Sequence, residues 1–299
     1  MFGLQRWQVE NTVKLIDEGN TIPFIARYRK EAHGTLDDQV LRELSEKLEY
    51  LHNLDKRREE ISASITAQEK MTPEIEAALE KASTLAEIED IYRPFRPKRR
   101  TRASIAKEKG LEPLADAIFA QVADSASPAE LAADYIDAEK GAETVEDAIN
   151  GAMDIIAENI SDDADIRRRL RSLFTVAGVL QSRAADSKKE SVYTMYYEYD
   201  EPVNKIAGHR VLAVNRGENE GFLKVGIDVD RIKALNIINA NVLSDNGSAC
   251  TDTVRDAAAD AYDRLIFPSV EREIRNMITD SAVESALKVF YVNLRELLL

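Results

Sequence analysis

The segment from Tyr92 to Gly110 concentrates the residue types that bind phosphate. It reads YRPFRPKRRTRASIAKEKG, and it carries a local charge of +7 inside a chain whose formal net charge is −14. Arginine suits this chemistry because its planar guanidinium stays charged and can meet two phosphate oxygens at once. We call this segment the basic arch. Its candidate residues for binding nucleic-acid phosphates are Arg93, Arg96, Lys98, Arg99, Arg100 and Arg102.

Prolines and aromatic residues are interleaved with these cations. Pro94 and Pro97 disfavour helix, so we expect the arch to be mostly irregular and exposed. A stiffened loop loses less entropy on binding than a flexible tail does. Tyr92 and Phe95 add rings on which bases would stack. The alternatives are that the arch packs against further domains or pairs with an acidic part of the chain, and the residues leave these open.

The acidic total does not exclude a polyanionic partner. From Gly110 to Asp165 the chain has fifteen Asp or Glu residues and one Lys, a local charge of −14. A concentrated basic patch acts over about one Debye length, roughly 10 Å at moderate salt. The distribution of charge therefore matters more than the sum.

Two other basic stretches favour structural interpretations. Residues Ile22 to Ile25 precede a basic run, and we expect them to be buried core rather than a binding face, with Arg27 as an internal ion-pair partner. A second cluster is expected to be a solvated helix face, because pairs spaced i,i+4 are common on helices. That cluster comprises Arg167, Arg168, Arg169 and Arg171, facing Asp162, Asp163 and Asp165.

Residue patterns for catalysis or cofactor binding are missing, so we predict no enzymatic activity, no cofactor and no metal site. The three histidines form no zinc-binding pair, and the sequence has no GxxxxGK[ST], GxGxxG or GxSxG motif. Cys250 is the only cysteine, which excludes an internal disulfide and a thiol cluster. The sequence has no signal-peptide core or apolar run of about 20 residues, so we predict no membrane partner and a cytoplasmic location.

Helix formers dominate, and the predicted fold class is mainly α: multi-helix bundles with a long spanning helix and a small β element near 210–229. Capping boxes at Thr84 and Ser127 mark helix starts. The predicted helices lie at about 7–18, 36–67, 73–82, 85–92, 111–122, 128–138, 144–160, 163–174, 231–243, 252–266 and 269–297. Residues 192–199 have apolar spacing that favours helix. Alternation predicts a strand at Leu223 to Val229, with a partner near Arg210 to Val214.

Several blocks of the chain resemble the Tex family of bacterial transcription accessory proteins. These blocks are GNTIPFIARYRKE from Gly19, DKRREEI from Asp55, KMTPEI from Lys70, EDIYRPFRPKRRTRASIAKEKGLEPLA from Glu89 and HRVLAVNRGENEGFLKV from His209. Together they touch nearly the whole chain, and their combination is specific although each alone is weak.

The resemblance implies a nucleic-acid-associated factor acting in transcription, with helix-turn-helix-like elements in its helical N-terminal part. Their position is not assigned by the sequence. Family members are longer and continue into RNase H-like, helix-hairpin-helix and OB-fold RNA-binding domains. We therefore expect this chain to be an N-terminal fragment of such a protein.

The sequence thus predicts three segments: a helical domain with the basic arch at 1–110, an acidic helical bundle at 111–190, and a helical segment with short strands at 191–299. The predicted partner is RNA or DNA, bound non-specifically through its phosphates. The alternative is a helical scaffold that contacts the transcription machinery or further domains of the same protein.

Overall fold

The chain divides into two compact units in the computed structural model, which describes residues 3–97, 100–124 and 126–298. One unit comprises Met1–Phe95 and the other Arg96–Leu299. Helices dominate both, and one small sheet lies in the second, so the predicted mainly α fold class is confirmed. The division into three segments stays a prediction.

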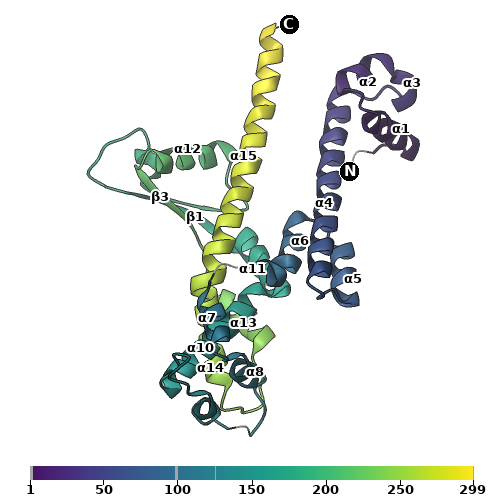
Figure 1. Ribbon diagram of the computed structural model, residues 1–299. Helices are drawn as coiled ribbons and strands as arrows, with labels where there is room; N and C mark the ends of the chain where they lie inside the picture. The colour runs from purple at the N-terminus through teal and green to yellow at the C-terminus, as the bar shows by residue number, and fades with distance from the viewer. Residues whose placement is uncertain (1–2, 98–99, 125, 299) are drawn as a thin grey trace. The chain divides into compact units, whose positions relative to one another are not determined.

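The first unit is organised around one long helix, as predicted. This is α4, which begins where the Asp37 carboxylate accepts a hydrogen bond from the Gln39 backbone N–H. Figure 1 shows α1, α2 and α3 gathered at its N-terminal end, and α5 and α6 at its other end. The helices are α1 (Arg6–Asp17), α2 (Ile22–Tyr28), α3 (Lys30–His33), α4 (Asp38–Ala67), α5 (Pro73–Lys81) and α6 (Leu85–Tyr92).

Two hydrophobic patterns on α4 explain this arrangement. Leu41 and Leu44 are buried near its start, whereas Leu54, Ile61 and Ile65 are buried in its second half. The second group forms a core cluster with Leu79 of α5 and Ile88 of α6, among others. The capping box predicted at Thr84 is present: Thr84 accepts from the Glu87 N–H, and the Glu87 carboxylate accepts from the Thr84 N–H. These contacts fix the start of α6, whose last residue, Tyr92, begins the basic arch.

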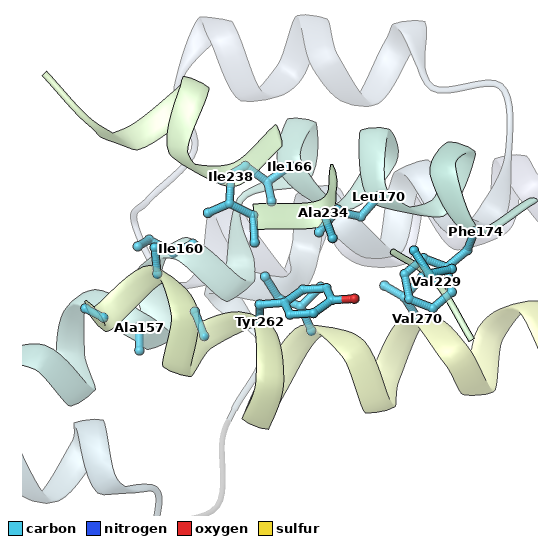
Figure 2. Close-up of a cluster of buried hydrophobic side chains, with 14 of the residues drawn as sticks. Ala157, Ile160, Ile166, Leu170, Phe174, Val229, Ala234, Ile238, Tyr262 and Val270 are labelled. Atoms are coloured by element: carbon cyan, nitrogen blue, oxygen red, sulfur yellow. The ribbon is translucent and has the colours of Figure 1, made fainter. Parts of the chain in front are cut away.

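In the second unit, α10 packs against α7, α8, α9, α11 and α14. Gly151 of α10 allows a close approach, because a Cβ atom there would lie 2.4 Å from Leu111 Cδ1. A π-helical segment, Ala261–Ile266, joins α14 to α15. Figure 2 shows the Tyr262 ring of that segment among side chains of α10, α11 and α13. The helices are α7 (Arg102–Glu108), α8 (Glu112–Phe119), α9 (Pro128–Ala132), α10 (Val145–Asp162), α11 (Ala164–Ala177), α12 (Gly208–Asn219), α13 (Arg231–Val242), α14 (Thr251–Asp260) and α15 (Phe267–Leu298).

The sheet confirms one predicted strand and corrects two other predictions. Its order is β2-β1-β3, both pairs antiparallel, with β1 at Val179–Ala184, β2 at Glu198–Pro202 and β3 at Leu223–Asp228. The strand predicted at 223–229 is therefore present. The partner predicted near 210–214 is wrong, because Val211 and Val214 are spaced by three residues and are buried on one face of α12.

The helix predicted over 192–199 is also wrong. A single 3-10 turn at Thr194–Tyr196 leads into β2. The buried hydroxyl of Ser182 in β1 donates to the Tyr196 carbonyl over 2.8 Å, and the Tyr196 and Tyr199 rings meet edge to face at 5.2 Å. Tyrosine packs well on a pleated surface, so pairing with β1 overrode the helical spacing.

In the part of the chain that the structure describes, no helix is long and apolar enough to cross a membrane.

Candidate nucleic-acid interface

The basic arch continues from the end of α6 and contains the junction between the two compact units. Arg93–Phe95 forms a 3-10 turn, residues 96–101 are irregular where described, and α7 begins at Arg102. The expectation of a mostly irregular arch is therefore wrong for its second half. Of the predicted site residues, the structure describes Arg93, Arg96, Arg100 and Arg102. Lys98 and Arg99 lie outside the described residues.

The aromatic residues of the arch pack against the first unit. The Tyr92 hydroxyl lies 3.0 Å from Ser64 Oγ, and the Arg57 guanidinium lies 5.8 Å from the centre of the Tyr92 ring. Phe95 packs on the same core cluster as Tyr92, and its carbonyl accepts a hydrogen bond from Gln68. Both rings are half-buried. The structure therefore uses Tyr92 and Phe95 to anchor the arch, and base stacking on them would first require them to unpack.

The second half of the arch is fixed by a capping box that the sequence analysis did not identify. The Ser104 N–H donates to Thr101 Oγ1 over 3.0 Å, and the Thr101 N–H donates to Ser104 Oγ over 2.8 Å. Ala103 and Ala106 are buried on the face of α7 that meets α10. Arg100 and Arg102, which flank the cap residue Thr101 in the sequence, are exposed.

Carboxylates already compensate part of the positive charge of the arch. Arg100 pairs with Glu108 over 3.1 Å, and 71% of the Arg100 side chain is exposed. Lys107 pairs with Glu112 over 2.7 Å. Such exposed pairs contribute only about 0–1 kcal/mol, so a phosphate can replace the carboxylate at little cost.

Two further interactions bear on the cations of the arch. Lys109 Nζ donates to the Gly141 carbonyl over 2.6 Å. Burial raises the pKa of Asp154 on α10, and the charges of Arg264 and Arg102 oppose that rise. Arg102 thus already has an acidic neighbour, and Arg93 and Arg96 each have interaction partners as well.

The cluster at Arg167 is only partly the solvated face that the sequence predicts. Arg168 and Arg169 pair with Asp165, as expected. Arg167 is instead fully buried, and it donates to Ser269 Oγ over 2.8 Å and to Glu273 over 2.5 Å. Arg171 binds the other Glu273 oxygen over 3.0 Å. These two arginines tie α11 to α15, so their role is structural, as predicted, but through burial rather than solvation.

The basic run at the end of α2 departs more strongly from expectation. Ile25 is fully buried, as predicted for the apolar part, but Phe24 beside it is exposed, and so are Tyr28 and Arg27. The prediction of a buried stretch from Ile22 to Ile25 is therefore wrong for Pro23 and Phe24. The prediction of Arg27 as an internal ion-pair partner is also wrong, because its side chain is exposed and forms no ion pair with the described residues. The helix α2, which packs on α4, buries Ile25 and leaves Phe24 and Tyr28 exposed.

Among the described residues, no group of three or more His, Cys, Asp or Glu side chains is arranged to hold a metal ion.

Comparison with known proteins shows the family. The family described as "Tex central region-like" matches residues 123–290, and the one described as "Tex-like protein N-terminal domain" matches residues 1–66. The first match alone covers more than half of the chain, and this chain belongs to the Tex family. The resemblance noted in the sequence is thus confirmed.

Three relatives show how the similarity is distributed. Protein YdcI of Bacillus subtilis is 43% identical over 99% of this chain and 42% of its own length. The transcriptional accessory protein Tex of Neisseria gonorrhoeae is 35% identical over 98% of this chain and 39% of its own length. The human S1 RNA-binding domain-containing protein 1 is 29% identical over 99% of this chain and 31% of its own length. The chain therefore spans about two fifths, or less, of the length of these relatives.

Proposed function

We propose that this chain is part of a nucleic-acid-associated transcription accessory factor, and that its basic arch contacts phosphates. Membership of the Tex family supports the transcription role, because one relative is named a transcriptional accessory protein. The name of another relative refers to an RNA-binding domain, which supports a nucleic-acid partner. The chain binds the phosphates of RNA or DNA, and such contacts carry no sequence information of their own.

One observation carries the proposal for the arch. Arg100 and Arg102 are exposed at the start of a capped helix whose other face is buried, so their backbone is fixed while their side chains reach solvent. The acidic partner of Arg100 is bound by an exposed, weak pair. Fixed, exposed cations that exchange partners at low cost are suited to phosphate.

A scaffold function is the second candidate, favoured by one feature of α15. From Val283 on, the described residues of α15 expose eight large apolar side chains, and five of them fall at the spacing i, i+4, i+7, i+11 and i+14, which is the heptad spacing of helix-to-helix contact. These five residues are Val283, Leu287, Phe290, Leu294 and Leu297. This stripe fits a helical protein partner, within the transcription machinery or further along the same protein, rather than a polyanion.

Fluorescence anisotropy with labelled single-stranded RNA and duplex DNA, at low and moderate salt, tests the arch. The test variant is R96A/R100A/R102A. The control R231A/K233A/R255A removes the same charge from exposed positions on α13 and α14. We expect only the test variant to weaken binding to both nucleic acids. Three lost phosphate contacts would lower the magnitude of the single-strand salt slope by about 2.

Equal weakening in the two variants would reduce the arch to a non-specific charge effect and contradict the proposal. Absence of binding by the wild-type chain even at low salt would favour the scaffold. The proposed role is binding without catalysis, and metal-dependent nuclease turnover by the purified chain would contradict that part of it.

A further inference from the structure

A second cationic surface, formed by residues distant in sequence from the arch, lies at α2 and the start of α3. Its core is a pair of exposed rings at helical i,i+4 spacing: Phe24 is 37% exposed and Tyr28 is 63% exposed. The ring centroids are 5.3 Å apart and the planes are inclined by 43°. Large aromatic side chains are usually buried, so two adjacent exposed rings indicate a contact surface.

Three cations flank these rings. The Arg29 guanidinium lies 5.6 Å from the centre of the Phe24 ring. Arg27 and Lys30, which lie within two residues of Arg29 in the sequence, are exposed. Within the described ranges, none of these three cations forms an ion pair, that is, none has a carboxylate oxygen within 4.0 Å of its charged nitrogen atoms. Glu31 follows on α3 and is also exposed. We call Phe24, Arg27, Tyr28, Arg29 and Lys30 the α2 patch.

Buried hydrogen bonds hold the backbone beneath this patch. His33 of α3 is fully buried, and its Nδ1 accepts the Leu36 N–H over 3.0 Å. Nε2 therefore carries the ring proton and donates to the carbonyl of Ile25 over 3.2 Å. One imidazole thus links α2 to the turn that leads into α4.

Side chains of α1 complete the support. Gln8 Nε2 donates to the His33 carbonyl over 3.2 Å, and Asn11 Nδ2 donates to the Ala32 carbonyl over 3.0 Å. These bonds satisfy carbonyls at the end of α3, which would otherwise lack partners. The rings and cations are therefore presented on a fixed backbone, which lowers the entropy lost on binding.

We propose that the α2 patch is a binding site for single-stranded nucleic acid. Unpaired bases stack on Tyr28 and Phe24, and Arg27, Arg29 and Lys30 bind the adjoining phosphates. Exposed aromatic rings combined with a cationic track are the means by which proteins bind single strands without reading their sequence. A duplex keeps its bases stacked on one another, so it gains only the charge contacts. The site goes beyond the proposed phosphate contact of the arch and rests on separate observations.

The charge pattern decides between this partner and a protein. Exposed aromatic and arginine residues also serve as hot spots in protein interfaces. From Thr21 to Lys30, however, the sequence has three basic residues and no acidic residue, and the cations have no ion-pair partners among the described residues. A cationic surface of this kind is complementary to a polyanion.

Anisotropy with a short labelled single-stranded RNA and with a duplex of equal length tests the proposal on the full chain. The variant F24L/Y28L keeps apolar bulk but removes the rings. We expect about tenfold weaker single-strand binding, an unchanged salt slope, and unchanged duplex binding, because stacking contributes about 1–3 kcal/mol per base. Unchanged single-strand affinity, in a variant whose thermal unfolding matches wild type, would overturn the proposal.

Charge variants test the phosphate contacts separately. R27Q/K30Q removes two cations from the patch, and R6Q/K14Q removes two exposed cations from α1. The patch variant is expected to lower the magnitude of the single-strand salt slope by about 1.4, whereas the α1 variant leaves it close to wild type. Loss of binding by R27Q/K30Q but not by F24L/Y28L would indicate a charge-recognising surface, such as one for an acidic protein segment, and would contradict base stacking.

Photo-crosslinking places the contact directly. RNA containing 4-thiouridine is irradiated with the wild-type chain, and the crosslinked peptides are identified by mass spectrometry. We expect crosslinks at Phe24 or Tyr28, and we expect them to persist in R96A/R100A/R102A at protein concentrations that restore binding. Crosslinks confined to the arch would overturn this proposal and leave the one for the arch intact.

Discussion

The arch and the α2 patch have similar composition, but their side chains are used differently. In the arch, Tyr92 and Phe95 pack on the core of the first unit, and Arg100 and Lys107 are paired with carboxylates. In the α2 patch the rings are exposed, and the cations have no ion-pair partners among the described residues. The arch carries more positive charge, whereas the α2 patch exposes its aromatic rings and has cations without ion-pair partners among the described residues.

This difference shows that the partners of a cation, and not its presence in a basic run, indicate what it does. Exposed paired cations can exchange a carboxylate for a phosphate on any strand. Exposed rings beside unpaired cations offer stacking as well, and stacking requires unpaired bases. The two surfaces should therefore respond differently to single strands and duplexes.

The largest expected effect concerns a third basic cluster, which contains a buried ion pair. Glu273→Ala removes the carboxylate that binds both Arg167, which is fully buried, and Arg171. Breaking a buried pair in this way costs about 3 kcal/mol of unfolding free energy. Urea unfolding followed by circular dichroism measures it.

A matched control removes an exposed partner instead. Asp165→Ala frees Arg168 and Arg169, and we expect a loss below about 1 kcal/mol. An equal loss of unfolding free energy in the two variants would show that burial of an ion pair does not determine its contribution to stability.

The next largest effect is expected from a backbone change at the end of α3, close in sequence to the α2 patch and distant from the arch. Gly34 has φ +65°, and a Cβ atom there would lie 2.7 Å from the Trp7 ring. Gly34→Ala should cost about 2 kcal/mol from backbone strain and the clash together. Since Trp7 is the only tryptophan of the chain, its fluorescence during urea unfolding reports on this region. Weaker single-strand binding with little change in duplex binding should accompany the loss.

Gly19→Ala is the control, because Gly19 has φ +84° and nothing within 4 Å of the added atom. It should show only the backbone strain, about 1 kcal/mol. If the two variants lose the same stability, the contact between Trp7 and Gly34 does not support the patch.

Combining the arch and patch variants tests whether the two surfaces act independently. When F24L/Y28L is added to R96A/R100A/R102A, the fold losses in single-strand affinity should multiply, because the two sets of residues belong to different compact units. Anisotropy on the two variants and their combination provides a double-mutant cycle. A combined loss no greater than the larger single loss would mean that both variants disrupt one common site.

The smallest expected effect is a gain. Glu108→Gln removes the charge that pairs with Arg100, so binding to single strands and to duplexes should tighten about twofold at low salt. Glu46→Gln makes the same charge change on an exposed face of α4 and serves as the control. Equal tightening by both would indicate that only net charge matters.

Local patterns predicted much of the fold. The capping boxes at Thr84 and Ser127 and the long helix α4 are present as expected. The short strands were harder, since β1 was not predicted and the spacing of Tyr193, Tyr196 and Tyr197 resembled a helix. Pairing between distant strands decides such segments, and local propensity does not contain that information.

The sequence predicts the positive charge of the candidate site but not the contacts that its side chains make. The sequence shows eight cations between Arg93 and Lys109. It does not show that Gln68 and Ser64 hold the aromatic side of the arch. The run IPFI appears uniformly apolar, yet a helix of seven residues buries Ile25 and exposes Phe24. Which face of a short helix is covered depends on its neighbours, and these are set by the tertiary fold.

The most direct test of the account compares F24L/Y28L with R96A/R100A/R102A for binding to one single-stranded RNA and one duplex of equal length, at the same salt. The account predicts that the aromatic variant lowers the preference for single strands about tenfold, whereas the arginine variant weakens both nucleic acids by similar factors. Equal changes in that preference for the two variants would contradict the distinction between the α2 patch and the arch.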